Sequence, residues 1–227
     1  RVIAHYRILN VNIRLLTQNL FFLIPVLIFI ITGIVFLVLF PKDFIHITQN
    51  GWYSPSMDGF FKYFTYLGDG LAFLVVGIAL MFVKWRYVMG FMIVALLTLL
   101  STGFLKNVVY KGTPRPSKYF ENTYDLRVVE GVELHQLNSF PSGHTTSAFA
   151  CWGFVAFLVR RRELKFLMFL VAATVGYSRI YLSQHFLEDV IAGAFLGTLI
   201  ALVSYSIAHR FKKEWNDRRL VLKRKAD

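Results

Sequence analysis

The sequence predicts an all-α, polytopic membrane protein, and three observations lead to this fold class. Of the 227 residues, 56% are hydrophobic and 17% are charged, and the mean hydropathy is +0.53. A soluble domain carries about 25% charged residues, so this charged fraction is low. Apolar stretches long enough to cross the ~30 Å hydrocarbon core of a bilayer recur along the chain. We therefore expect a bundle of transmembrane helices, and the composition excludes a disordered, collagen-like or small secreted protein.

Six stretches qualify as transmembrane helices. They cover residues 20–40, 67–83, 87–105, 145–159, 166–182 and 190–208. The first is expected to be a structural helix, because it is too long for a cleavable signal peptide and five more spans follow it. The fourth is short, and we expect it to include part of the polar sequence before residue 145. The sequence shows no internal repeat, so we expect a single membrane-embedded domain over residues 1–227.

The distribution of Lys and Arg predicts how the spans are oriented. Seventeen of the 25 Lys and Arg residues fall on the side of the bundle that carries both chain ends. Short cytoplasmic loops are enriched in these residues, so we expect both termini in the cytoplasm. We interpret the net charge of +12 as a determinant of topology that also favours contact with anionic lipid, and not as a sign of nucleic-acid binding.

Two loops on the opposite side of the bundle differ in composition. Residues 41–66 are rich in Trp, Tyr and Phe, which concentrate at membrane–water interfaces, so we expect an interfacial helix or loop between the first two spans. Residues 106–144 are mostly polar and longer than a connector requires, and such loops are usually functional. The single cysteine, Cys151, excludes an internal disulfide and a multi-cysteine metal site, and we expect it to be a small core residue.

The first group of candidate functional residues is the tetrapeptide Pro-Ser-Gly-His at residues 141–144, directly before an apolar helix. Ser142 can cap that helix, and the free N–H groups of a helix N-terminus beside Gly143 can hold an anion. His144 can donate a hydrogen bond to the same anion. An ordinary capping turn with an incidental histidine is the alternative interpretation.

The second group lies between the fifth and sixth spans, at residues 178–189. His185 and Asp189 are four residues apart, so on a helix they share a face, and a carboxylate there can hold one ring nitrogen and leave the other free to react. This is the arrangement of an activated nucleophile and the group that orients it. Arg179 lies near the hydrocarbon boundary, where a charge needs a partner or a function. The alternative is a polar helix start in which Asp189 is a favourable first-turn acid.

The third group is Arg115 and a lysine that precedes it. Prolines at positions 114 and 116 hold the backbone around Arg115 extended, which suits the presentation of its guanidinium to a phosphate. Lys106, at the end of the third span, is the expected companion, and Lys111 is the competing candidate. For each of these cations, snorkelling to the membrane interface is the alternative interpretation.

In this order along the chain, the three groups closely resemble the membrane branch of the type 2 phosphatidic acid phosphatase superfamily, which also includes bacterial acid phosphatases and vanadium haloperoxidases. The family pattern is Lys, six residues, Arg-Pro; then Pro-Ser-Gly-His; then Ser-Arg, five residues, His, three residues, Asp. The second and third parts match at every fixed position. In the first part eight residues separate Lys106 from Arg115, and an insertion of two residues in the loop 110–114 would account for the difference.

The resemblance implies a hydrolase of phosphomonoesters or pyrophosphates that works through a phosphohistidine, with no metal and no other cofactor. It implies that His185 is the nucleophile, that Asp189 orients it, and that His144 acts first as general acid and then as general base. It also implies which groups hold the phosphate oxygens, namely Lys106, Arg115, Arg179, Ser142 and the backbone N–H of Gly143. Phosphoryl transfer depends mainly on positioning and charge neutralisation, so three cations can take the place of the usual magnesium.

A pocket at the outer headgroup level suggests an amphiphilic substrate whose phosphate enters the site while its tail stays in the bilayer. The resemblance leaves four bacterial candidates, which are polyprenyl (undecaprenyl) diphosphate, phosphatidylglycerol phosphate, phosphatidic acid and the phosphates of lipid A. We expect the loop at residues 117–138 to choose among them. We expect the protein in the bacterial inner (cytoplasmic) membrane, with the active site on the periplasmic or extracellular side; the sequence predicts no oligomeric state.

Two other functions stay open at this point. A phosphotransferase would pass a phosphoryl group or phospho-headgroup to a second lipid through the same histidine. An anion transporter or channel is disfavoured, because charged or broken-helix features at mid-membrane are few and mere binding would not require the pair His185 and Asp189. Of the other titratable residues, we expect His46 and His135 to be solvated in outer loops, and Asp69 to be either the partner of a cation or a helix cap.

Overall fold

The structure is a computed structural model that describes residues 16–210 and residue 220. Over these residues the regular structure is helical, apart from an isolated β-bridge between Pro114 and Leu137. The α-helices are α2 (Leu20–Leu39), α3 (Lys42–Asn50), α4 (Pro55–Phe64), α5 (Gly70–Met81), α6 (Trp85–Phe104), α7 (Pro116–Tyr119), α8 (Gly143–Leu158), α9 (Arg162–Tyr181) and α10 (Leu187–Ala208). A 3₁₀ turn η1 (Thr65–Gly68) precedes α5, and a π-helical turn η2 (Leu105–Val109) continues α6.

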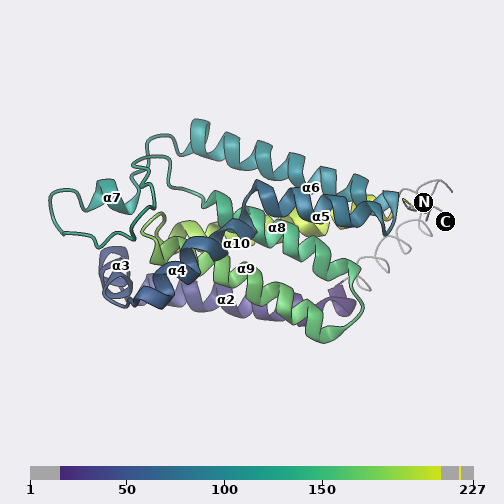
Figure 1. The fold of residues 1–227 in the computed structure, drawn as a ribbon, viewed down its shortest axis with the longest axis horizontal. Coiled ribbons are helices and arrows are strands. Elements are labelled where there is room, and N and C mark those ends of the chain that lie inside the picture. Colours follow the sequence, from purple (N-terminus) through teal and green to yellow (C-terminus); the bar gives the residue numbers. More distant parts are fainter. Residues whose placement is uncertain (1–15, 211–219, 221–227) are drawn as a thin grey trace, which may run out of the picture.

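The long helices form a bundle, and its two ends differ. The first residues of α2 and the last residues of α10 lie at one end, whereas α3 and α7 lie at the other (Figure 1). The parts of the chain at residues 1–15, 211–219 and 221–227 lie outside the described residues, so most of the cationic side that predicts cytoplasmic termini is not described. Exposed apolar side chains cover the long helices, as expected for helices that face lipid.

The all-helical membrane fold is confirmed, and the number of spans depends on how two elements are counted. In the described part of the chain, four helices are long and apolar enough to cross a membrane: α2, α6 with η2, α9 and α10. A fifth is reached if Pro55–Gly68 and Gly70–Met81, which meet at a bend of 53°, form one span. The second predicted span, at residues 67–83, therefore covers only the second half of a bent segment. The helix α8, with 16 residues, is shorter than a full span.

The helix α8 is short because protein, not lipid, surrounds it. Residues on all of its faces are buried, including Phe149, Cys151 and Phe154, each with an exposed fraction of 0%. At a rise of about 1.5 Å per residue its length falls below the ~30 Å of the hydrocarbon layer. Polar backbone at membrane depth is tolerated where protein covers it, so α8 can begin below the membrane surface, at residue Gly143. The prediction that Cys151 is a core residue is confirmed.

Close packing of α8 against α10 holds this central helix in place. A Cβ atom on Gly197 would lie 2.4 Å from the carbonyl oxygen of Thr146, and one on Gly193 would lie 2.8 Å from that of Ser142. Small residues spaced by four along a helix let two backbones approach in this way in membranes. The contact sets the distance between the N-terminus of α8 and the first turn of α10, which carry two of the three predicted groups.

The segment between the first two predicted spans contains two short helices, α3 and α4, as an interfacial element requires. Ser54 caps α4 by accepting a hydrogen bond from the backbone N–H of Met57, at 3.2 Å. Large side chains of this segment are exposed to solvent or lipid, and these are Phe44, Trp52, Tyr53, Met57, Phe60, Tyr63 and Tyr66. The polar loop that follows η2 carries only the single-turn helix α7 and runs to the start of α8.

Candidate active site

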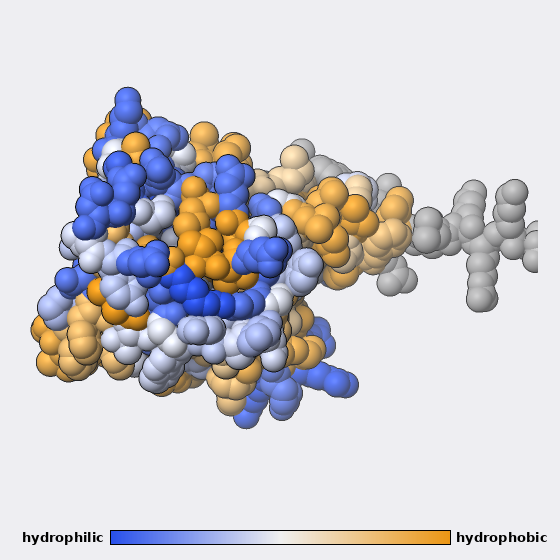
Figure 2. Space-filling view, turned by 60° about the vertical axis from the view of Figure 1, so that its left-hand side comes forward, coloured by the Kyte–Doolittle hydropathy of each residue, from blue (hydrophilic) through white to orange (hydrophobic). Residues whose placement is uncertain are grey.

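Six of the eight predicted site residues line one pocket of about 400 Å³ near the end of the bundle that carries α3 and α7. These are Lys106, Arg115, Gly143, His144, Arg179 and His185. The other two, Ser142 and Asp189, are buried behind the pocket, with exposed fractions of 0% and 1%. Figure 2 shows that strongly hydrophilic side chains surround a hydrophobic patch on this end of the molecule. The tertiary structure thus brings together residues from three separate parts of the sequence.

His185 lies in the turn before α10, and not on the helix as its spacing from Asp189 predicted. The helix begins at Leu187, so the expected shared helical face is wrong for this pair. The side chains still meet, because Asp189 in the first turn reaches back: its Oδ2 lies 3.3 Å from Nδ1 of His185 and accepts from the backbone N–H of Phe186 at 2.9 Å. Nδ1 is thereby held, and Nε2 is left for the pocket.

A third residue, Ser139, joins this pair and was missed by the sequence analysis. Its hydroxyl donates to Oδ2 of Asp189 at 2.5 Å and lies 3.3 Å from Nδ1 of His185. Ser139 stands two residues before the Pro-Ser-Gly-His tetrapeptide and is 2% exposed. One carboxylate oxygen therefore receives a hydroxyl, a backbone N–H and the imidazole, which fixes the position of the Asp189 carboxylate.

The surroundings of His185 favour its neutral form. Burial lowers the pKa of this histidine well below its ordinary value of 6.5, and the nearby charges of Arg115, Lys106 and Arg179 lower it further. A neutral imidazole keeps the lone pair that a nucleophile needs. The same cations would attract an anionic substrate, so they act on both partners of a reaction in this pocket.

The tetrapeptide forms the N-terminus of α8, as predicted. The Ser142 hydroxyl accepts hydrogen bonds from the backbone N–H of Thr145, at 3.4 Å, and from its hydroxyl, at 2.8 Å. The backbone N–H of Ser142 donates to the carbonyl oxygen of Asp189 at 3.0 Å, which ties α8 to α10. Gly143 and His144, the first residues of the helix, line the pocket. The free N–H groups and the dipole of this helix end favour a bound anion.

Of the two candidate lysines, Lys106 and Lys111, the structure places Lys106 in the pocket. It lies in the π-helical turn η2, beyond the last α-helical residue, Phe104, and its amine donates to the carbonyl oxygen of Asn138 at 3.0 Å. Lys111 is exposed and is not among the residues that line the pocket. A π-helical turn shifts the register of the side chains that follow it and is frequent at functional sites.

The two arginines reach the pocket from different elements, Arg115 from the residue before α7 and Arg179 from the last turn of α9. Arg115 has an extended backbone, as its flanking prolines predicted, and NH1 of its guanidinium donates to Oε1 of Gln184 at 3.2 Å. Burial lowers the pKa of Arg115 from its ordinary value. Arg179, only 7% exposed, donates from NH1 to the hydroxyl of Thr65 at 2.8 Å, and its buried Nε has no partner among the described residues. This Nε–H can therefore donate a hydrogen bond to a ligand in the pocket.

A fourth cation, Lys62 of α4, also lines the pocket and lies outside the three motifs. Its amine donates to the carbonyl oxygen of Glu130 at 2.8 Å. The loop passes close to this amine at Gly131, which has a φ of +71°. A Cβ atom at this position would lie only 2.6 Å from Nζ of Lys62, so the approach requires glycine. Within the described part of the chain, the pocket cations bond neutral oxygens and none forms an ion pair with a carboxylate. Their charge is left for a ligand.

Three further predictions on titratable residues have mixed outcomes. The expectation that His46 is solvated is wrong: it is 1% exposed and packs against the rings of Phe120 and Phe186. Burial lowers the pKa of His46 to about 4. His135 is exposed as expected, but it lines the pocket. Asp69 is a helix cap, because its side chain accepts from the backbone N–H of Gly70 at 2.7 Å.

By fold and site, the protein belongs to a class of all-helical membrane proteins with a cationic pocket lined by three histidines, His135, His144 and His185. Among the described residues, no group of three or more His, Cys, Asp and Glu side chains is placed to hold a metal ion. Comparison with known proteins gives the particular family. The profile of the PAP2 superfamily matches residues 84–213. The chain belongs to this superfamily and is a membrane phosphatase of the PAP2 type.

Relatives and solved structures agree with this assignment. The chain is 29% identical to a lipid A 4'-phosphatase of Bacteroides thetaiotaomicron over 71% of its own length and 74% of that protein. The crystal structure of Aquifex aeolicus LpxE has a TM-score of 0.61 at 28% identity, over 71% of this chain and 93% of that one. A PAP2-type phosphatidylglycerolphosphate phosphatase of Bacillus subtilis has a TM-score of 0.60 at 21% identity, over 86% and 99%, and shows the same fold.

Proposed function

We propose that the protein hydrolyses a phosphomonoester or pyrophosphate of a membrane lipid through a phosphohistidine on His185. One observation carries this proposal. The Nδ1 atom of the buried His185 imidazole is held 3.3 Å from the Asp189 carboxylate, and His185 lines a pocket together with four cations. Binding alone would not require an oriented imidazole, whereas a nucleophile does.

In the first step, Nε2 of His185 attacks the phosphorus atom. The new P–N bond forms as the P–O bond to the leaving group breaks, and His144, protonated when the phosphate anion is bound, gives its proton to the leaving oxygen. Lys106, Arg115 and Arg179 neutralise the charge on the equatorial oxygens, together with the N-terminus of α8. Asp189 stabilises the positive charge that develops on the His185 ring.

In the second step, His144, now neutral, takes a proton from a water molecule. The water oxygen attacks phosphorus from the side that the leaving group occupied, the P–N bond breaks, and inorganic phosphate leaves. His185 returns to its neutral form and His144 to its protonated form. We propose that this cycle needs no metal, because the cations of the pocket supply the positive charge that magnesium provides in other phosphoryl-transfer enzymes.

Among the four lipid candidates, we propose the phosphates of lipid A first. Two relatives that match more than two thirds of the chain are named lipid A 4'-phosphatases, from Bacteroides thetaiotaomicron and Porphyromonas gingivalis, at 29% and 25% identity. A phosphatidylglycerophosphatase B of Bacillus subtilis matches only 33% of the chain. Lys62 adds a cation beyond the three that the family motifs supply, which favours a substrate that carries more negative charge than the phosphate being cleaved.

We also propose the orientation predicted from the cationic residues, with both termini in the cytoplasm and the pocket at the periplasmic or extracellular face of a bacterial inner membrane. The arrangement of α2 and α10 supports this proposal, since the start of one and the end of the other lie at the end of the bundle opposite the end that carries α3 and α7 (Figure 1). A site at the membrane surface lets the lipid tail stay in the bilayer.

The test is release of inorganic phosphate from the four lipids by purified protein in the presence of EDTA. We expect release from lipid A phosphate by the wild type and none by His185→Ala. His135→Ala is the matched control, because His135 also lines the pocket but has no role in the mechanism. Full activity of His185→Ala, or loss of wild-type activity in EDTA, would contradict the proposal.

A second measurement separates the roles of the two histidines. With p-nitrophenyl phosphate the leaving group needs no proton, so His144→Ala should still form the phosphoenzyme but hydrolyse it slowly. We expect acid-labile phosphate on His185 to accumulate in this variant. A phosphotransferase is the rival function, and it would release phosphate only when a second lipid is present as acceptor.

A further inference from the structure

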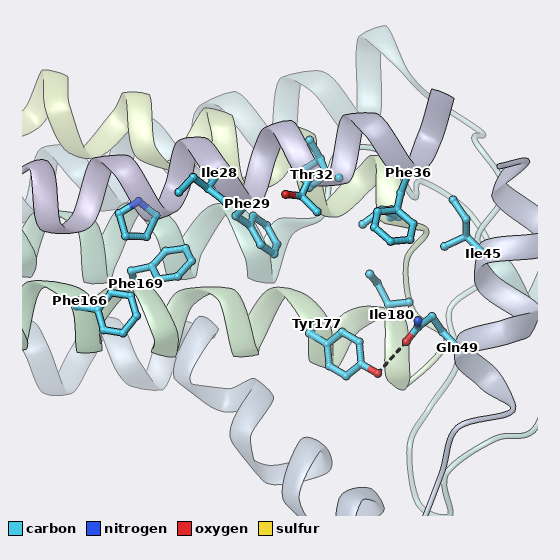
Figure 3. A pocket seen from close by; sticks show the side chains of 14 residues that line it. Ile28, Phe29, Thr32, Phe36, Ile45, Gln49, Phe166, Phe169, Tyr177 and Ile180 are labelled. Atoms are coloured by element: carbon cyan, nitrogen blue, oxygen red, sulfur yellow. Dashed lines mark hydrogen bonds between the residues drawn. The ribbon is translucent and has the colours of Figure 1, made fainter. Parts of the chain in front are cut away.

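A second cavity, of about 540 Å³, lies between α2 and α9 and is lined almost wholly by apolar side chains (Figure 3). Its walls come from four helices, with Ile28, Phe29, Thr32 and Phe36 on α2, Ile45 and Gln49 on α3, Phe166, Phe169, Tyr177 and Ile180 on α9, and Leu187 and Ile191 on α10. We call it the α2–α9 groove. Its volume falls in the range of ligand pockets, about 300–1,000 Å³.

The mouth of the groove opens onto the apolar surface of the bundle. Three wall residues are well exposed, namely Ile28 at 59%, Phe36 at 48% and Phe166 at 43%. The neighbouring faces of α2 are equally apolar, with Leu27 56% and Ile31 51% exposed. Because α2 and α9 are membrane spans by length and composition, the medium at the mouth is hydrocarbon.

The groove has a closed floor and one polar end. The floor is closed where α2 meets α10, because a Cβ on Gly33 would lie 2.3 Å from Cδ1 of Ile191. At the end towards α3, the hydroxyl of Tyr177 donates to Oε1 of Gln49 at 2.8 Å (Figure 3). A long apolar trough that ends in a pair of polar groups matches the chemistry of an acyl chain and its ester linkage.

We propose that the α2–α9 groove binds the acyl chain of a bilayer phospholipid, and that this lipid braces α3 against the catalytic turn. On α3, Ile45 and Gln49 line the groove, whereas the residue after each of them, His46 and Asn50, is buried and contacts Ser183. His46 Nε2 lies 3.3 Å from the hydroxyl of Ser183, and Asn50 donates to the same hydroxyl at 3.1 Å.

The bracing matters because Ser183 belongs to the turn that carries the nucleophile. Gln184, which holds Arg115, follows it, and His185 comes next. A lipid chain that packs against Ile45 and Gln49 therefore keeps α3 in the position in which His46 and Asn50 contact Ser183. The groove and the catalytic pocket share no lining residue, so the occupant is a resident lipid and not the substrate in its reacting position.

Lipid retention is the first test. Wild type, Thr32→Trp and Ile31→Trp are purified in detergent with dioleoyl phosphatidylcholine and examined by native mass spectrometry. Thr32 lines the groove, so its replacement by Trp fills the space, whereas Ile31 is exposed on a neighbouring face of the same helix and is the matched control. We expect wild type and Ile31→Trp to keep a bound phospholipid that Thr32→Trp loses. Equal retention by all three, or none by wild type, would overturn the proposal.

Activity towards p-nitrophenyl phosphate, which has no acyl chain, is the second test. We expect delipidated wild type and Ile31→Trp to gain activity when phosphatidylcholine is added back, and Thr32→Trp to show no response. A response of Thr32→Trp equal to that of wild type would contradict the bracing. If Thr32→Trp instead raised the KM only for long-chain phosphatidic acid over short-chain phosphatidic acid, the groove would hold the chain of the substrate, and the proposal would be wrong. The retention test needs no catalysis, so it stands apart from the proposed function.

Discussion

The catalytic pocket and the α2–α9 groove lie on either side of the last turns of α9, and one is cationic whereas the other is apolar. Arg179 lines the catalytic pocket with three other cations, whereas its neighbour Ile180 and Tyr177, half a turn back, line the apolar α2–α9 groove. Successive residues on a helix point about 100° apart, so one turn can face two different environments. A charge near hydrocarbon is costly, and the apolar side of α9 separates Arg179 from the groove.

This difference in lining indicates a different role for the pocket and for the groove. In the pocket, cations are held by neutral oxygens, such as the hydroxyl of Thr65 for Arg179 and the carbonyl of Asn138 for Lys106. These bonds position the charges without cancelling them, which is the condition for electrostatic catalysis. In the groove, a ligand meets mainly apolar side chains, together with the hydroxyl of Thr32 and one hydrogen-bonded pair, Tyr177 and Gln49. Changes in the pocket should therefore affect turnover, and changes in the groove should affect stability and lipid response.

The largest effect is expected from Asp189→Asn, which keeps the size of the side chain and removes its charge. An amide can no longer stabilise the imidazolium and can select the wrong tautomer of His185, so we expect kcat to fall by about 10³–10⁴-fold. The variant should keep its fold, because Asn can still accept from the backbone N–H of Phe186. Single-turnover release of phosphate measures the effect. A loss below tenfold would show that His185 does not depend on this carboxylate.

Arg179→Lys should cost about 10²-fold in kcat. The substitution keeps a positive charge but removes the planar fork and the Nε donor that the structure leaves without a partner. Loss of one preorganised donor to a developing charge has an effect of this size. The same steady-state assay measures it, and circular dichroism controls for the fold. A change seen only in KM would mean that Arg179 binds the substrate and the transition state equally.

The pH dependence of kcat/KM provides a test of smaller size. In the proposed mechanism His185 must be neutral to attack, and burial lowers its pKa well below 6.5, so its protonation should reduce the rate only well below pH 6.5. Arg115→Gln removes one of the charges that lower this pKa, so the acid limb should move to higher pH. Titration of the substrate phosphate is common to both proteins and cancels in the comparison. An acid limb that does not move would contradict the electrostatic coupling of Arg115 and His185.

Lys62→Met should raise the KM for lipid A phosphate by up to about tenfold, with kcat nearly unchanged. Lys62 is partly exposed, and a partly exposed charge contributes about 1 kcal/mol or less, which corresponds to a factor below ten. Lys118→Met is the matched control, because Lys118 is exposed, pairs with Glu121 at 2.5 Å and does not line the pocket. An equal change in KM in the two variants would show that Lys62 does not take part in substrate recognition.

The smallest effect is expected on the groove side, from Tyr177→Phe. The variant loses the hydrogen bond to Gln49, which should lower the free energy of unfolding by about 1 kcal/mol and leave kcat unchanged when phosphatidylcholine is present. Thermal unfolding in detergent and phosphate release measure the two quantities. A fall in kcat in the presence of phosphatidylcholine, without a loss of stability, would mean that Tyr177 supports the site by a route other than the bound lipid.

The sequence predicted the site residues from local patterns but not the groups that support them. Ser142 and Gly143 directly precede an apolar stretch, and this position predicts that they start a helix. Ser139 and Thr65 carry no local signal, because an isolated Ser or Thr is common in any loop and their partners, Asp189 and Arg179, lie 50 and 114 residues away. The spacing of His185 and Asp189 suggested a shared helix, whereas the turn before α10 brings the two together by another route.

The sequence by itself determined the membrane class, the approximate spans and the residues of the three motifs, because transfer of apolar side chains into hydrocarbon and the capping of helices depend on local composition. Only the tertiary structure decided which residues meet: that Lys106 and Lys62 enter one pocket, that His46 is buried, and that α2 leaves a groove against α9. These outcomes depend on how the helices pack, and close contacts such as that of Gly197 with Thr146 set that packing. Contacts between distant parts of the chain are a property of the assembled bundle, and no single segment encodes them.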